Sequence, residues 1–178
     1  MKKFFLIILI TFAIVACEDT SYQKVQIDDK FSLSLPGYLS EANGLNDEAS
    51  LQYQNLIKEF YTIVIDENIE TFNNAIIDNE LQEVYSTDLD GYYSLLIDTF
   101  SEGIDVFSKS DPENITINGM PAKFVEIEGA VDNVNIYYHY TIVKGEKDYY
   151  QILSWTLRDR KVNYNEQMGE VANSFVEI

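Results

Sequence analysis

The sequence is poor in the residues that most often stabilise a fold through covalent or metal bonds, since it contains one cysteine and one histidine. A single cysteine cannot form a disulfide within the chain, so stability must come from the core. The lone His139 cannot supply the ligand cluster typical of a zinc site, and there is no reactive cysteine with which it would form a Cys–His pair. We therefore expect no bound metal.

Positive charge is also scarce. The sequence has 12 lysines and arginines against 30 aspartates and glutamates, which gives a formal net charge of −18 at pH 7. Such a surface repels nucleic acids and anionic lipid headgroups, so we expect no nucleic-acid partner. The acidity does not identify a cationic partner, because carboxylates spread over a surface most often serve solubility.

Long apolar runs are missing as well. The run from Phe4 to Ala16 has 13 residues, about 20 Å as a helix, whereas the hydrocarbon core of a bilayer is about 30 Å thick. Lys2 and Lys3 precede this run, and a small residue, Ala16, ends it. This pattern is typical of a secretory signal peptide.

The residue after this run is the only cysteine, and Ile14-Val15-Ala16-Cys17 resembles the lipobox of bacterial lipoproteins. In that family the cysteine thiol carries a diacylglycerol, the signal is cut just before it, and the new amino group is usually acylated. The resemblance implies a signal peptide over residues 1–16, cleavage between Ala16 and Cys17, and a lipidated tether over residues 17–24. The lipid on Cys17 would be the only cofactor. An ordinary secretory signal whose cleavage leaves a cysteine is the alternative.

Two or three acyl chains anchor a protein stably, whereas one holds it only marginally. We therefore expect the mature protein in a bacterial cell envelope, held at the periplasmic face of the outer membrane. Glu18 and Asp19 follow the cysteine and resemble the surface-export signals of lipoproteins from the Bacteroidetes group, which leaves surface display as the alternative.

Beyond the tether, residues 25–178 have the length of one domain. Apolar residues three or four apart predict a helix over Leu89–Phe107, with Thr87 and Asp90 as its capping box. The Asn118-Gly119 pair predicts a hairpin turn. Alternating patterns predict strands over residues 25–27, 31–35, 50–54, 59–66, 115–117, 122–128, 134–143 and 149–157. A weak helical pattern includes Ile69, Phe72 and Ile76 and extends toward Leu81 and Val84. A last helix carries Tyr164, Met168, Val171, Ala172, Phe175 and Val176 on one face.

This order of elements is that of an α+β fold, in which helices cover an antiparallel sheet. The order, together with Phe31-Ser32-Leu33-Ser34-Leu35-Pro36, Ile117-Asn118-Gly119-Met120-Pro121-Ala122 and the last helix, resembles the PsbP-like fold shared by bacterial DcrB lipoproteins and a Ran-binding nuclear import factor. The resemblance implies a sheet sandwiched by helices, over about residues 25–178, and a family whose members mostly bind or assemble with other proteins. It carries over no catalytic residue.

Tyrosines concentrate in the last two predicted strands. Alternation places Tyr138 and Tyr140 on one face, opposite Tyr137 and His139, and it places Tyr149 and Trp155 together on one face of the next strand. Helices on both sides of the sheet would bury most of them, and the remainder would line a groove for a peptide or sugar. The candidate binding surface consists of Tyr138, Tyr140, Tyr149 and Trp155, together with Arg158 and Arg160 from the one locally basic stretch.

Catalytic motifs are weak. No G-x-S-x-G elbow surrounds any serine, and nothing selects two of the many carboxylates as a glycosidase pair. A calcium loop beginning at Ser86 lacks the aspartate at its first position and, at Ile97, the bidentate glutamate at its twelfth. Asp88 and Asp90 are better explained as helix-capping residues.

We therefore expect a membrane-anchored envelope lipoprotein that is not an enzyme and that binds another envelope protein. The alternative is a lipoprotein that binds a small ligand or carbohydrate through the tyrosine-rich sheet, with a hydrolase as a more distant third.

Overall fold

The computed structural model describes residues 21–178. The predicted signal peptide, its cleavage site at Ala16 and Cys17, and most of the predicted tether lie outside the described residues. Within residues 21–178, no helix has both the length and the apolar character needed to cross a bilayer.

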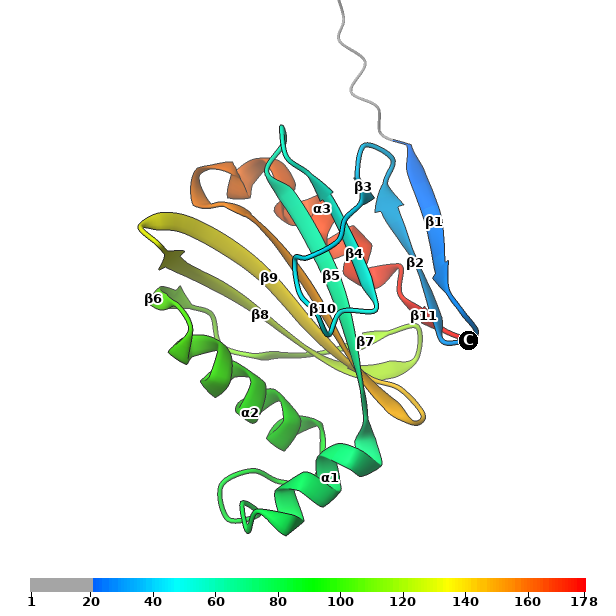
Figure 1. The fold of residues 1–178 in the computed structure, drawn as a ribbon, viewed down its shortest axis with the longest axis vertical. Helices are drawn as coiled ribbons and strands as arrows, with labels where there is room; N and C mark the ends of the chain where they lie inside the picture. The colour runs from blue at the N-terminus through cyan, green and yellow to red at the C-terminus, as the bar shows by residue number, and fades with distance from the viewer. Residues whose placement is uncertain (1–20) are drawn as a thin grey trace, which may run out of the picture.

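Two antiparallel sheets form the β part of the fold (Figure 1). The larger sheet has the order β3-β4-β5-β10-β9-β8-β6, and β7 pairs with β8. Its strands are β3 (Ser40–Glu41), β4 (Leu51–Asn55), β5 (Phe60–Asn68), β6 (Asp105–Lys109), β7 (Glu113–Ile117), β8 (Met120–Val131), β9 (Val134–Lys144) and β10 (Asp148–Leu157). The smaller sheet has the order β1-β2-β11, with β1 (Tyr22–Ile27), β2 (Phe31–Pro36) and β11 (Val176–Glu177).

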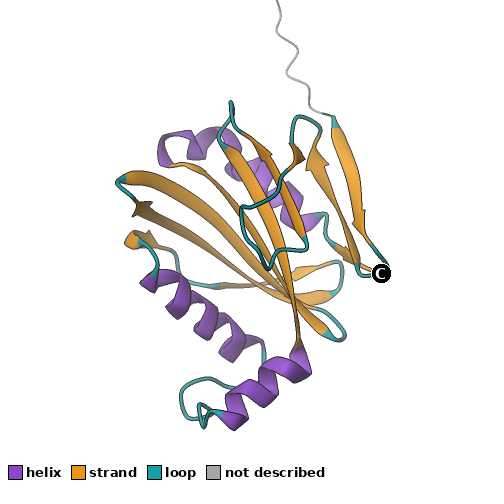
Figure 2. Ribbon diagram, viewed as in Figure 1, coloured by secondary structure: helices purple, strands orange, loops and turns teal. Residues whose placement is uncertain are grey.

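Helices pack on both faces of the larger sheet (Figure 2). Helices α1 (Ile69–Asp78) and α2 (Leu89–Glu102) share one core cluster with one face of the sheet. Helix α3 (Lys161–Asn173), which follows the short 3₁₀ helix η1 (Arg158–Arg160), lies with β2 on the other face and shares a second cluster. The predicted α+β architecture, an antiparallel sheet between helices, is confirmed.

The sheet predictions agree closely with the structure. The first hairpin forms between β1 and β2, and β8, β9 and β10 form the predicted antiparallel meander. Asn118 and Gly119 both have positive φ, +47° and +88°, at the turn between β7 and β8, as a tight hairpin turn requires. Strand β1 begins at Tyr22, which pairs with Pro36, three residues before the predicted start of the first strand at Val25.

The helix boundaries need correction. Helix α2 ends at Glu102 rather than Phe107, because residues 105–109 form β6 and pair with β8. Ile104 packs against the same core cluster as the helix, so the apolar spacing continues past the point where the helix stops. The N-cap is Asp88 rather than Thr87, since the Asp88 carboxylate accepts a hydrogen bond from the Gly91 N–H at 3.0 Å.

The first and last helices are shorter than their apolar patterns. Leu81 and Val84 lie beyond the end of α1, and Val84 is exposed. Phe175 is fully buried but follows α3, and Val176 belongs to β11. In both places apolar residues outside the helix continue its spacing in sequence, so spacing alone overestimates the helix length.

Candidate binding surface

The aromatic side chains of β9 and β10 are divided between the two faces of the larger sheet, as the alternation predicts. Tyr138, Tyr140 and Tyr149 belong to the cluster under α1 and α2, whereas Tyr137 and Tyr150 belong to the cluster under α3. Both faces therefore carry an aromatic layer, and the covering helices determine which rings reach the solvent.

Tyr140 and Tyr149 are core residues rather than members of a binding surface, because α1 and α2 cover them. They are 3% and 0% exposed. The Tyr149 ring stacks on Tyr92 of α2, with ring centroids 4.1 Å apart. The Tyr140 hydroxyl donates to Gln151 at 2.5 Å, and the Gln151 amide donates to the Tyr92 hydroxyl at 2.9 Å. This network satisfies the hydroxyls of Tyr140 and Tyr92, whereas the buried Tyr149 hydroxyl has no partner among the described residues. Burial leaves none of these rings available to a ligand.

Tyr138 and Trp155 lie where the helical cover ends. Tyr138 is 7% exposed and packs edge-to-face on Phe100 of α2, whereas Trp155 is half-buried. The Trp155 ring stacks on Tyr61 of β5, with centroids 5.3 Å apart and planes 9° from parallel. Strand pairing sets this contact, because Tyr61 is directly opposite Trp155 across β5 and β10.

A shallow apolar hollow of about 310 Å³ opens beside this aromatic pair. Leu45 and Asn46, in the loop before β4, form one wall of this hollow. The Gln52 side chain holds the loop in place, since it accepts hydrogen bonds from the Leu45 and Asn46 N–H groups and donates one to the Asn46 carbonyl. The hollow is lined by Leu45, Asn46, Ile63, Val131, Ile136, Tyr138, Leu153 and Trp155.

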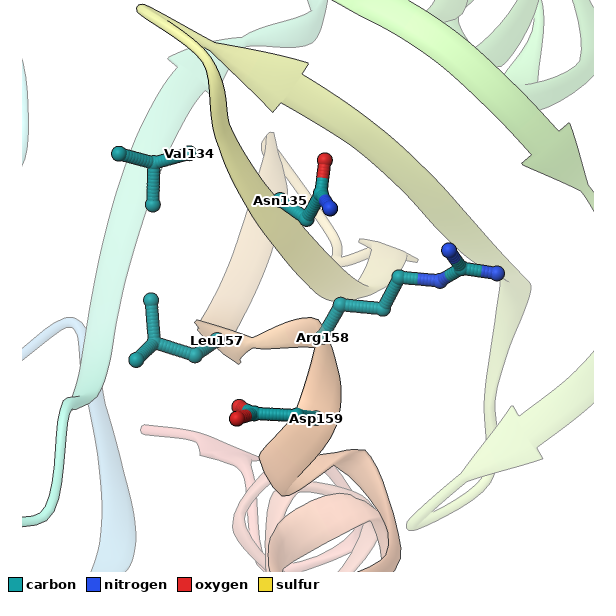
Figure 3. A pocket seen from close by; sticks show the side chains of 5 residues that line it. All are labelled: Val134, Asn135, Leu157, Arg158 and Asp159. Carbon is teal, nitrogen blue, oxygen red and sulfur yellow. The ribbon is translucent and has the colours of Figure 1, made fainter.

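A second hollow, of about 510 Å³, adjoins the first at the ends of β9 and β10. Val134, Asn135, Leu157, Arg158 and Asp159 line it, and Figure 3 shows Val134 and Leu157 extending to the same side while Arg158 extends away from them. Leu157 pairs with Ile136, a residue of the first hollow. The two hollows, together with Tyr61 stacked against Trp155, form a continuous strip. We call it the open sheet face: Tyr61, Ile63, Val131, Val134, Ile136, Leu153, Trp155 and Leu157.

The two candidate arginines diverge. Arg158 lies against Glu128, with Nε and Oε2 2.6 Å apart, and its guanidinium lies 6.0 Å from the centre of the Phe107 ring. Arg160 instead donates to the Ile57 carbonyl at 3.0 Å. Of the two, only Arg158 borders the second hollow, so the predicted basic stretch does not form one patch.

His139 lies on the opposite face of the sheet. Its ring is 8% exposed and lies 4.4 Å from the Phe124 ring, facing Gly169 of α3. Burial lowers the pKa of His139 to about 4, so the ring is neutral at pH 7. It borders a hollow of about 240 Å³ with Thr141 and Asn173 among its lining residues.

The acidic residues form no metal site within residues 21–178, where no three His, Cys, Asp or Glu side chains are placed to hold an ion. Asp88 caps α2 and also accepts from the Ser86 hydroxyl at 2.6 Å. Asp90 forms an ion pair with Lys123. Asp88 and Asp90, the two aspartates of the candidate calcium loop, thus both have structural partners.

Sequence reasoning missed Tyr61 and the loop at residues 45–46. Tyr61 lies in a predicted strand, two residues before Ile63. This spacing places both side chains on the same face of the sheet, and it is the one sequence signal that could have identified Tyr61. Its position opposite Trp155 depends on β5 pairing with β10, a contact between strands far apart in sequence.

No protein-family model matches the chain, and no curated protein matches its sequence. The structure is similar to cyanobacterial PsbP (CyanoP) from Synechocystis, with 14% identity, a TM-score of 0.58, and coverage of 92% of this chain and 96% of that one. It is also similar to LpqN of Mycobacterium tuberculosis, a protein involved in cell envelope biogenesis, with 10% identity, a TM-score of 0.55, and coverage of 88% of this chain and 90% of that one. At these identities the likeness concerns the fold alone, and the chain has the PsbP-like fold that its sequence predicts.

Proposed function

We propose that this protein is an envelope lipoprotein, anchored through a lipid on Cys17, whose single domain binds another envelope protein. The lipobox Ile14–Cys17 supports the anchor, and the fold shared with LpqN, which is involved in cell envelope biogenesis, is compatible with this location. In this proposal the membrane and a protein are the partners, and the lipid is the only cofactor.

The open sheet face is the observation that supports the proposed binding role. The same face of the sheet is covered by α1 and α2 over Tyr140 and Tyr149, but it is left uncovered at Trp155, Val134 and Leu157. Apolar area contributes about 25 cal/mol per Å² when it leaves water. A contiguous apolar strip on a monomer is therefore typical of a surface that a partner covers.

A small ligand or carbohydrate is the second candidate. The stacked pair of Tyr61 and Trp155 favours it, since an aromatic ring offers flat apolar area to a sugar. The protein partner is better supported, because Tyr140 and Tyr149 are buried and the remaining strip is shallow and mostly aliphatic.

The role that we propose is non-enzymatic. The one histidine is neutral at pH 7 and packs against Phe124 and Gly169, which favours a structural role. Asp88 and Asp90 are likewise engaged in a helix cap and an ion pair.

The anchor is tested by replacing the lipidated cysteine. We expect Cys17→Ser to move the protein from the membrane fraction, washed with carbonate, to the soluble fraction. A Cys17→Ser variant that stays with the membrane after this wash would show that the anchor is not a lipid on this residue.

The binding face is tested by crosslinking and affinity capture of the lipidated protein from gently solubilised cells. Val134→Asp places a charge on the open sheet face, and Val84→Asp places the same charge on a loop elsewhere; the two valines are 45% and 68% exposed. We expect Val134→Asp to lose the captured partner and Val84→Asp to retain it. Equal capture by both variants would contradict a role for the open sheet face. Melting-temperature shifts with sugars or peptides, with no partner captured, would favour the ligand-binding alternative.

A further inference from the structure

Among the described residues, four large apolar side chains are more than 60% exposed: Val84, which is 68% exposed and follows α1, and three others that lie elsewhere. Leu56 and Ile57, at the turn between β4 and β5, are 65% and 89% exposed, and Val162, in the first turn of α3, is 87% exposed. The turn is well ordered by hydrogen bonds, because the Asn55 side chain accepts from the Ile57 and Lys58 N–H groups at 3.1 and 2.9 Å. Single exposed apolar residues are common, so what matters is where these three lie.

They lie at the end of the domain where the described chain begins. The Gly37 N–H donates to the Ser21 carbonyl at 2.7 Å, and the Asn55 side chain donates to the Tyr38 carbonyl at 2.8 Å. These bonds connect the first residue of the domain to the turn that carries Leu56 and Ile57. Arg160 connects that turn to the start of α3 through the Ile57 carbonyl. Figure 1 shows the same arrangement, with the start of β1, the β4–β5 turn and the start of α3 at one end and α1 at the other.

The distance to the proposed anchor is short. Ser21 is the fourth residue after Cys17, and four residue steps span at most about 14 Å even when the chain is fully extended. The headgroup region on one side of a bilayer is roughly 5–8 Å thick. A lipid on Cys17 therefore holds this end of the domain against or close to the headgroups.

The charge of this end differs from that of the whole protein. The segments 55–59 and 157–163, which carry the three apolar side chains, contain Lys58, Arg158, Arg160 and Lys161 against Glu59 and Asp159. Arg158 and Lys161 also pair with Glu126 and Glu128, so the charges of these groups sum to zero. The whole chain has a net charge of −18 and repels anionic headgroups elsewhere. Approach of this end to a membrane is therefore less opposed than the net charge of the whole chain would indicate.

We propose that Leu56, Ile57 and Val162 insert into the lipid interface beside the anchor and fix the orientation of the domain on the membrane. This inference rests on the lipid anchor proposed above. The strands of the larger sheet run away from this end (Figure 1), so the sheet stands upright on the bilayer. The open sheet face then faces sideways, where a neighbouring envelope protein reaches it.

The test uses single cysteines labelled with an environment-sensitive nitrobenzoxadiazole dye in the full, lipidated protein. Cys17 is the only native cysteine and its sulfur is alkylated in the lipidated form, so an introduced cysteine is the one free thiol. Ile57→Cys and Val162→Cys report on the proposed contact. Ile77→Cys is the matched control, because Ile77 is 50% exposed and lies on α1, at the opposite end. All three sites are exposed, and far-UV circular dichroism checks that each variant folds.

The labelled proteins are reconstituted into vesicles of phosphatidylethanolamine and phosphatidylglycerol and separated by flotation. We expect the dye at residues 57 and 162 to brighten several-fold and shift to the blue on the floating vesicles, with no change at residue 77. Protein that floats while the dye at residues 57 and 162 stays water-exposed overturns the insertion and leaves the anchor standing. Protein that does not float overturns both proposals, and equal changes at all three sites overturn the fixed orientation.

Discussion

The buried histidine makes the stability of the domain depend on pH in a predictable direction. Burial lowers the pKa of His139 from 6.5 to about 4, against partial opposition from the nearby Glu126 carboxylate. The folded state therefore binds fewer protons than the unfolded state between these two pH values. It follows that the free energy of unfolding contributed by His139 is fully present above pH 6.5 and falls as the pH decreases toward 4.

The size of this loss follows from the shift. At pH 5 an unfolded histidine is mostly protonated, whereas His139 in the fold remains mostly neutral. The 1.5 pH units between its ordinary pKa and pH 5, at 1.36 kcal/mol each, amount to about 2 kcal/mol. Burial alone would raise the pKa of Glu126, but hydrogen bonds from Tyr137 and Lys161 outweigh it and hold that pKa below its usual range. Glu126 therefore stays charged at pH 5 and does not obscure the effect.

The assay is urea unfolding at pH 7 and pH 5, followed by Trp155 fluorescence and far-UV circular dichroism, of the wild type and His139→Gln. Comparing the change with pH in each protein removes the effect of the substitution on stability at pH 7. We expect the wild type to lose about 2 kcal/mol more than His139→Gln between the two pH values. Equal losses in the two proteins, or a titration midpoint near 6.5 for His139 by NMR, would refute the reasoning.

Three further predictions concern stability and are measured by urea or thermal unfolding. Asp88→Ala removes the carboxylate that caps α2 and should cost about 1 kcal/mol, while Asp88→Asn should retain most of the stability. Gly91→Ala should cost more than Asp88→Ala, because a Cβ at residue 91 would lie 1.8 Å from the Ser86 carbonyl oxygen; an unchanged melting temperature would show that the turn before α2 moves freely. Phe175→Ala empties a fully buried site between the rings of Phe31 and Tyr150 and should cost about 3–5 kcal/mol, whereas Val84→Ala, at an exposed site, should cost almost nothing.

The sequence predicts the strand meander and the face of each tyrosine well, because a period of two residues fixes which side chains share a face. Tyr138 and Tyr140 are opposite Tyr137 and His139 for this reason. The family resemblance, based on hairpin and helix patterns, agrees with the similarity to CyanoP and LpqN. The lipid on Cys17 and the cleavage after Ala16 stay predictions, since these residues lie outside residues 21–178.

The errors have a common physical cause. Ile104 packs against the same cluster as the apolar side of α2 and continues its spacing beyond the end of the helix. Phe107, the next residue in that spacing, is 48% exposed because residues 105–109 form β6 and pair with β8. The residues of the binding surface could not be predicted either, because they depend on which elements pack together in three dimensions. Tyr140 is buried and Trp155 half-exposed because α1 and α2 cover only part of the sheet, and Tyr61 lies opposite Trp155 because β5 and β10 are neighbours.

The small sheet ties together the two ends of the described chain. Strand β2 pairs on one side with β1 and on the other with β11, and the Ile178 N–H donates to the Lys30 carbonyl at 2.9 Å. Contacts between residues so far apart in sequence are costly to close and form late. Until residues 176–178 are made, β2 lacks its second partner strand. The small sheet is thus completed only after β11, at residues 176–177, has been translated.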